Sequence, residues 1–159
     1  MADTEERPDI KIDGNVATWE MKLEGDISGT YMGVFRFRCY LTPLQQIAAG
    51  REERGLMGTN IAVASEHERF LAFALTQLKY RIISAPPFWA SANPNGDIPG
   101  DIPDEDVIAK ILDAAVIAEK KYKDGLKARK DEALQKAKRM IEKIEQQDKA
   151  ESKEEPSEE

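Results

Sequence analysis

The chain of 159 residues has little of what most often carries chemistry, since it contains one cysteine, Cys39, and one histidine, His67. A single cysteine excludes an intrachain disulfide and fits a reducing compartment. No apolar run approaches the roughly 18 residues that a membrane span needs, and the acidic, polar residues 1–9 do not resemble a secretory signal. The sequence therefore predicts a cytoplasmic protein that does not act in a membrane.

The chain also lacks an excess of positive charge. Its formal net charge is −7, so few cations are available to neutralise phosphates, and we expect no nucleic-acid partner. The charge is unevenly spread, because residues 1–118 carry 11 basic and 18 acidic side chains whereas residues 119–159 carry 12 of each. Dense but balanced charge is typical of a solvated helix.

The candidate catalytic and metal-binding residues do not form a set. His67 lies in the first turn of a predicted helix without an orienting partner, and Cys39 lies on the apolar face of a predicted strand without a base. The acidic loop that starts at Asn93 departs from the EF-hand pattern, because its sixth and twelfth positions are Ile98 and Asp104 instead of glycine and glutamate. We therefore expect neither an enzyme nor a cofactor nor a metal site.

Alternating apolar and polar residues predict strands in the first quarter of the chain. The alternation runs over residues 17–23 and 31–41, and Glu24-Gly25-Asp26 between them indicates a turn. Residues 10–12 could add a short third strand. A lone hairpin is marginally stable in water, so its apolar face needs a packing partner.

Helices follow the strands. Capping boxes formed by Thr42 with Gln45 and by Ser65 with Glu68 predict helices near 42–54 and 65–84. The second helix is predicted to be the core element, because its apolar stripe is wide; its members are Phe70, Leu71, Phe73, Ala74, Leu75, Leu78 and Ile82. A third helix is expected to begin near Asp101 or Asp104, and its distal half is expected to project or to fold back at Gly125.

The sequence thus predicts an α+β fold, with an N-terminal antiparallel β-hairpin or small sheet packed on about three helices, the last of them long and charged. We divide the chain into a flexible N-terminus (1–8), an α+β domain (9–125), a charged helical extension (126–147) and a disordered acidic tail (148–159). The tail has too few apolar residues to offset the entropy of ordering.

Two aromatic or apolar features of the domain could contact other proteins. Met32, Val34 and Tyr40 are predicted to lie on the side of the hairpin away from the helices, where either a further strand covers them or another chain docks. Phe88 and Trp89 follow a double proline and are either packed on the core as a plug or exposed as an anchor.

The distal helix offers a third candidate surface. Leu134, Ala137, Ile141 and Ile144 follow one another at spacings of 3, 4 and 3, which indicates a weak heptad seam among charges. Such a seam could bind a partner helix, and self-association through it is left open.

The order of these parts resembles the tail assembly chaperones of long-tailed bacteriophages over roughly residues 15–125. The resemblance is one of pattern, and the segments that carry it are Gly33-Val34-Phe35-Arg36-Phe37-Arg38, a capped helix from Thr42, Leu56-Met57-Gly58-Thr59-Asn60, Ala64-Ser65, Arg81-Ile82-Ile83, Ala85-Pro86-Pro87-Phe88-Trp89 and a helix from Asp104. It implies a mostly helical, non-enzymatic protein of the host cytoplasm that coats the tape measure protein and recruits the tail tube protein, and that is absent from the finished particle.

Other functions remain alternatives at this point. The first is a structural virion component or internal scaffold that acts through its long helix, and the second is an enzyme regulator or small adaptor unrelated to phages. An enzyme is disfavoured, because no nucleophile and base can be paired.

Overall fold

The computed structural model describes residues 7–59 and 61–152, and it confirms the α+β fold. The chain forms two compact units, residues 1–122 and residues 123–159, which are treated separately below. The predictions of a flexible segment over residues 1–6 and of a disordered tail over residues 153–159 lie outside the described residues.

Within the first unit, an antiparallel sheet is built from β1 (Ile10–Asp13), β2 (Val16–Gly25), β3 (Gly29–Arg38) and β4 (Ile82–Ser84), in that order. The predicted hairpin is confirmed, and so are the faces of residues 17–23 and 31–38. Trp19 of β2 lies opposite Phe35 of β3, and Ala17 lies opposite Phe37, with all four side chains buried. These cross-strand pairs form the apolar face on which the helices pack.

The short strand β4 corrects the predicted end of the second helix. That helix was expected to continue to residue 84, but it ends at Arg81, and Ile82 takes up extended geometry with φ −73° and ψ 123°. Ile82 and Ser84 then pair with Phe37 and Arg36 of β3. Adjacent β-branched isoleucines favour this pleated conformation once a sheet edge is within reach.

The helical elements are α1 (Pro43–Met57), the 3₁₀ turn η1 (Ile61–Val63), α2 (Glu66–Arg81), the single turn α3 (Pro87–Ala90) and α4 (Glu105–Glu151). Both predicted capping boxes are present, with Thr42 and Gln45 at α1 and with Ser65 and Glu68 at α2. The helix α1 runs three residues beyond its predicted end at Arg54. It stops before Gly58, whose φ of 76° suits glycine.

The core lies between the sheet and the inner faces of α2 and of the first part of α4. Val107, Ile108, Ile111, Leu112 and Ala115 of α4 are buried, as is Leu78 of α2, whereas Leu71 and Leu75 are partly buried. Phe70 and Phe73 contradict the prediction, because both are exposed. They lie three residues apart on a face of α2 that turns away from this core.

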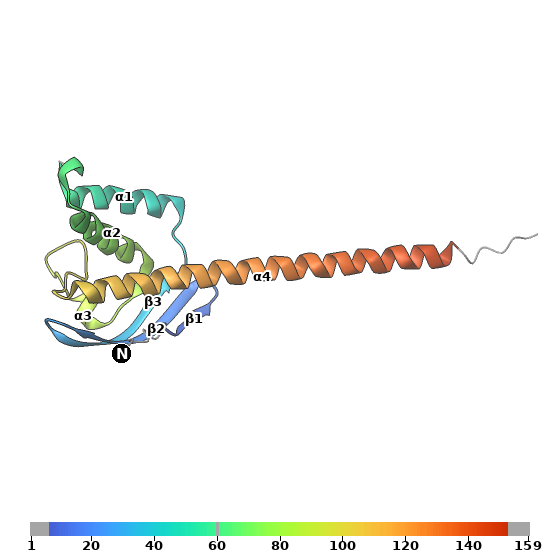
Figure 1. Ribbon diagram of the computed structural model, residues 1–159, viewed down its shortest axis with the longest axis horizontal. Helices are drawn as coiled ribbons and strands as arrows, with labels where there is room; N and C mark the ends of the chain where they lie inside the picture. Colours follow the sequence, from blue (N-terminus) through green and yellow to red (C-terminus); the bar gives the residue numbers. More distant parts are fainter. Residues whose placement is uncertain (1–6, 60, 153–159) are drawn as a thin grey trace, which may run out of the picture. The chain divides into compact units, whose positions relative to one another are not determined.

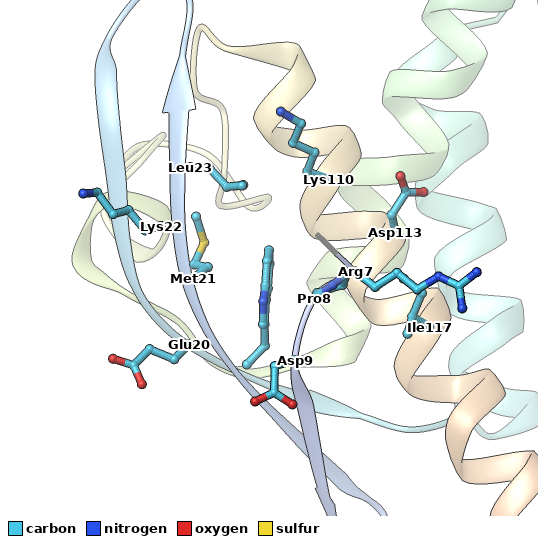
Figure 2. Close-up of a pocket in the computed structure, with 11 residues that line it drawn as sticks. Arg7, Pro8, Asp9, Glu20, Met21, Lys22, Leu23, Lys110, Asp113 and Ile117 are labelled. Carbon is cyan, nitrogen blue, oxygen red and sulfur yellow. The ribbon is translucent and has the colours of Figure 1, made fainter. Parts of the chain in front are cut away.

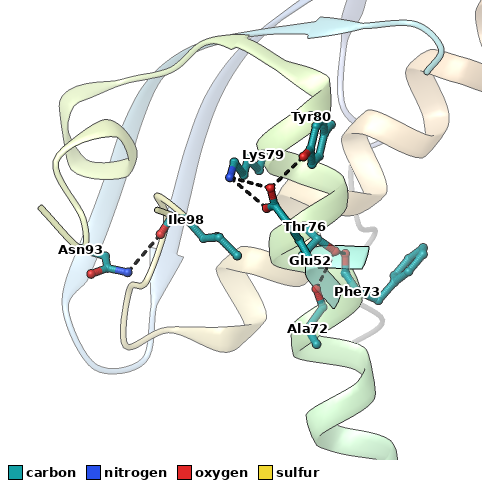
Figure 3. Close-up of polar contacts among 8 residues, drawn as sticks. All are labelled: Glu52, Ala72, Phe73, Thr76, Lys79, Tyr80, Asn93 and Ile98. Atoms are coloured by element: carbon teal, nitrogen blue, oxygen red, sulfur yellow. Dashed lines mark hydrogen bonds and ion pairs between the residues drawn. The ribbon is translucent and has the colours of Figure 1, made fainter. Parts of the chain in front are cut away.

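The helix α1 lies on the side of α2 that faces away from the sheet (Figure 1). A polar cluster fastens the two helices, in which the Glu52 carboxylate accepts hydrogen bonds from Lys79 Nζ at 2.9 and 3.0 Å and from Tyr80 Oη at 2.7 Å (Figure 3). Burial would raise the pKa of Glu52, but the bonds from Lys79 and Tyr80 outweigh it, and that pKa is lowered.

The helix α4 is continuous from Glu105 to Glu151, which excludes the alternative in which it folds back at Gly125. A glycine inside a helix costs only about 1 kcal/mol relative to alanine, and the helix formers on both sides of Gly125 offset that cost. The helix also continues past Asp148, where the disordered tail was predicted to begin.

Candidate functional site

The polar side chains that could support chemistry do not gather into a site. The Nε2 atom of His67 lies 3.2 Å from a carboxylate oxygen of Glu105, with both side chains more than half exposed. Cys39 is buried, and burial raises the pKa of its thiol. Among residues 7–59 and 61–152, no cluster of His, Cys, Asp or Glu could hold a metal ion, and no helix is long and apolar enough to cross a membrane. Exposed apolar surfaces therefore supply the candidates.

The outer face of the sheet presents Met32 and Val34, which are 61% and 47% exposed. The residues opposite them on β2 are Lys22 and Glu20, and together they border a hollow of about 430 Å³. The expected covering strand is not found in the described part of the chain, because β4 pairs edge-on with Arg36 and Phe37. The two apolar side chains stand among charges and make a small patch.

Tyr40 does not share that surface, which contradicts the prediction. The strand β3 ends at Arg38, and the Tyr40 ring lies against Tyr122 of α4 with ring centroids 5.6 Å apart. Because side chains alternate between the two faces only within a strand, this alternation no longer determines the face on which residue 40 lies.

Phe88 and Trp89 form the plug that was one of the two alternatives. Trp89 is 1% exposed and packs edge-on against Phe35 at 5.8 Å, and Phe88 packs edge-on against Tyr31 at 4.9 Å. The single turn α3 packs both rings against the core, where Trp89 is buried and Phe88 remains partly exposed.

The distal part of α4, which belongs to the second unit, carries an apolar row that we call the distal stripe. Leu134, Ile141 and Ile144 belong to it as predicted, and the structure adds Met140. These four side chains are between 55% and 65% exposed. At 100° per residue they span one face of the helix together with Ala137. Sequence reasoning missed Met140 because a strict heptad places it beside the seam.

Charge is distributed unevenly along the two sides of the distal stripe. Arg129, Lys136 and Lys143 follow one another at intervals of seven and so line one side. Lys136 also pairs with Glu132 at 2.7 Å, one turn away. The other side alternates in sign; its members are Lys127, Asp131, Lys138 and Glu145. The basic row therefore favours a partner helix with acidic side chains along one side.

A further exposed apolar set lies on α1, η1 and α2, and sequence reasoning did not identify it as surface. Its members are Leu44, Ile47, Val63, Phe70 and Phe73. Figure 3 shows the Phe73 ring extending away from α2. The signal in the sequence was the offset of Phe70 and Phe73 from the stripe of Leu71 and Leu78, which places them on another face.

A buried carboxylate fixes the turn between β2 and β3. Asp104, directly before α4, accepts hydrogen bonds from the backbone N–H groups of Ile27 at 2.6 Å and Ser28 at 2.9 Å and from Tyr31 Oη at 2.7 Å. Burial would raise the pKa of Asp104, but these hydrogen bonds outweigh it and lower that pKa. A side chain at Gly25 would meet the carboxylate at 2.6 Å, which only glycine avoids. The end of the hairpin is thereby held to α4.

Comparison with protein-family models, with curated proteins and with solved structures finds no match for this chain.

Proposed function

We propose that this chain is a non-enzymatic assembly chaperone that holds a helical segment of a protein partner against the distal stripe. Following the resemblance of its sequence pattern, the partner is the tape measure protein of a long-tailed phage, and the tail tube protein is recruited to the complex. The chaperone acts in the host cytoplasm and leaves before the particle is finished.

The observation that supports this proposal is the exposure of the distal stripe. Leu134, Met140, Ile141 and Ile144 stand more than half exposed on one helix face. Covering such a side chain stabilises a complex by about 25 cal/mol for each Å² of apolar surface removed from water. The stripe has no role in the core of the first unit, so its apolar character is better explained by a partner.

The chemistry of the stripe suits reversible binding. Its apolar centre is narrow, because Ala137 is small, and each contact contributes little. Many weak contacts along a long partner give retention through multivalency and still allow release. The basic row of Arg129, Lys136 and Lys143 orients a partner helix whose acidic side faces it.

Co-expression with the tape measure and tail tube proteins, followed by pull-down, tests the proposal. Ile144→Asp should reduce retention of the tape measure protein at least tenfold, because it places a charge in the stripe. Gln146→Asp is the matched control, since it adds the same charge about 200° around the helix and is also exposed. Equal retention by both variants would show that the stripe does not bind this partner.

The composition of purified particles separates the proposal from its alternative, a structural virion component or internal scaffold. A chaperone should be absent when the particles are examined by mass spectrometry. Stoichiometric presence of this chain, together with failure to retain either partner in the pull-down, would favour the structural component.

A further inference from the structure

A hollow of about 830 Å³ lies beside β2 in the first unit, and Met21 and Leu23 of β2 and Lys110 and Asp113 of α4 border it (Figure 2). Charged side chains of both signs line this hollow without a regular order, so its charges do not distinguish one occupant from another. The distal stripe differs in this respect, because the charges on its two sides recur at a fixed interval along one helix.

The side of the distal stripe opposite the basic row carries Asp131, Lys138 and Glu145, which we call the alternating flank. These residues follow one another at intervals of seven on the continuous helix α4, and all three are exposed. Lys138 directly follows Ala137, and Glu145 directly follows Ile144, so the flank borders the apolar residues of the stripe. Residues at this position of a heptad make the charge contacts between paired helices that set partner choice. A helix bound to the stripe must therefore complement the order negative, positive, negative.

A second copy of this chain does not complement the alternating flank when it runs antiparallel. The heptad seam of the stripe consists of Leu134, Ala137, Ile141 and Ile144. One register brings every seam residue of one copy to a seam residue of the other, so that Leu134 meets Ile144. In that register Lys138 lies opposite Lys138, and Asp131 lies opposite Glu145 in both directions. The basic rows of the two copies also lie on the same side. Like charges on both flanks therefore oppose self-pairing through the whole seam.

Sliding the second copy by one heptad removes the repulsion at the alternating flank but separates the seam. Lys138 then meets an acidic residue of the flank in both directions. However, a slide one way places Leu134 opposite Glu151, and a slide the other way places Ile141 opposite Lys130. Apolar contacts are thus replaced by contacts with charged side chains. Two identical chains cannot satisfy both the seam and its alternating flank in the antiparallel direction.

A parallel second copy is opposed by like charges at the two ends of the seam. Equivalent positions face each other in a parallel pair without stagger. Lys130 stands one heptad before Ala137, and Asp148 stands one heptad after Ile141. Lys130 would thus meet Lys130, and Asp148 would meet Asp148. The antiparallel direction brings Lys130 to Asp148 instead, so it is the direction expected for a copy whose flank has been made complementary.

We infer that the alternating flank makes the distal stripe specific for a helix with the reverse order of charge and discriminates against a second copy of this chain. Such a helix carries Lys or Arg opposite Asp131 and Glu145, and Asp or Glu opposite Lys138, beside an apolar seam. This specificity rests on the proposed function, since it describes the helix that the distal stripe holds. Repulsion of the wrong partner adds to attraction of the right one, and here it leaves the stripe of the free chain uncovered by its own copies.

A chain with a reversed flank, Asp131→Lys/Lys138→Glu/Glu145→Lys, provides the complementary helix for the test. Every contact of the alternating flank joins opposite charges when this full-length variant pairs antiparallel with the unmodified chain, whereas the basic rows are unchanged. Sedimentation velocity over a concentration series, with one chain fluorescently labelled, measures the mixed dimer and each chain alone. The mixed dimer should be at least about tenfold tighter than either self-dimer, and high salt should reduce this difference.

Two controls establish whether the distal stripe forms the interface of the mixed dimer. Glu132→Lys/Arg139→Glu/Gln146→Lys changes charges at the same intervals on the side of α4 that faces away from the stripe. The mixture of this variant with the unmodified chain should therefore gain no affinity. Ile144→Asp added to the reversed-flank chain should abolish the mixed dimer, because it places a charge in the seam.

Three results would each overturn the inference: a mixture that associates no more tightly than either chain alone, an equal gain from the control variant, or a mixed dimer that survives Ile144→Asp. None of these measurements uses the tape measure protein. Failure of the proposed function is recognised separately, because Ile144→Asp in the otherwise unmodified chain would then leave retention of the tape measure protein unchanged in the pull-down.

Discussion

Truncation of Leu78 measures whether the core has been placed correctly. Leu78 is fully buried on the inner face of α2, in the same apolar cluster as Phe35 and Ile111. Leu78→Ala removes three carbons, which corresponds to a transfer term of about 2.4 kcal/mol at about 0.8 kcal/mol for each group. The cavity that remains adds a cost that depends on how far its neighbours relax. The expected total is about 2–5 kcal/mol.

Urea unfolding followed by far-UV circular dichroism provides the assay. With a slope of about 2 kcal/mol per molar urea, the midpoint should fall by about 1–2.5 M while the slope stays the same. Ile144→Ala is the control, because it truncates an exposed aliphatic side chain in the second unit. It should cost less than about 0.5 kcal/mol in the monomer.

The difference between the losses of stability in these two variants tests where the hydrophobic core lies. Equal losses would refute the placement of the core between α2, α4 and the sheet. A large loss for Ile144→Ala at high protein concentration that disappears on dilution would instead reveal association through the distal stripe.

Three further predictions concern the first unit. The pKa of Asp104 lies below the ordinary value of 3.8, so its contribution to stability is present above pH 3.8 and is lost as the pH falls through the lowered pKa. Asp104→Asn should therefore lower the Tm at pH 7 and reduce the fall of Tm with decreasing pH in thermal melts. An equal fall of Tm in the variant and the wild type would contradict this prediction. Gly100→Ala should lower the Tm by several degrees, because Gly100 has φ 89° and an added Cβ would collide with the Trp89 ring; an unchanged Tm would show that the plug is loosely held. Deletion of residues 127–159 should leave the cooperative urea transition and its midpoint nearly unchanged, because the core lies earlier in the chain, and loss of cooperativity would show otherwise.

The candidate surfaces differ in how far sequence could reveal them. The distal stripe was predictable, because a row of apolar residues on a charged helix is a local periodic signal. The plug at Trp89 was not decided by such a signal, and for Phe73 the sequence indicated only which face of α2 the ring lies on. Whether an aromatic side chain is covered depends on which elements pack against it, and those elements are distant in sequence.

Local signals determined much of the secondary structure. Alternation located β2 and β3 and assigned their faces, and the side chains of Thr42 and Ser65 located the starts of α1 and α2, since both signals act over a few residues. Only the tertiary structure decided the remainder. The strand β4 forms because β3 offers an edge to Ile82, and the Asp104 carboxylate binds the turn at Ser28, far from it in sequence. Hydrogen bonds and packing between distant segments are established only when the chain is folded, so no local pattern encodes them.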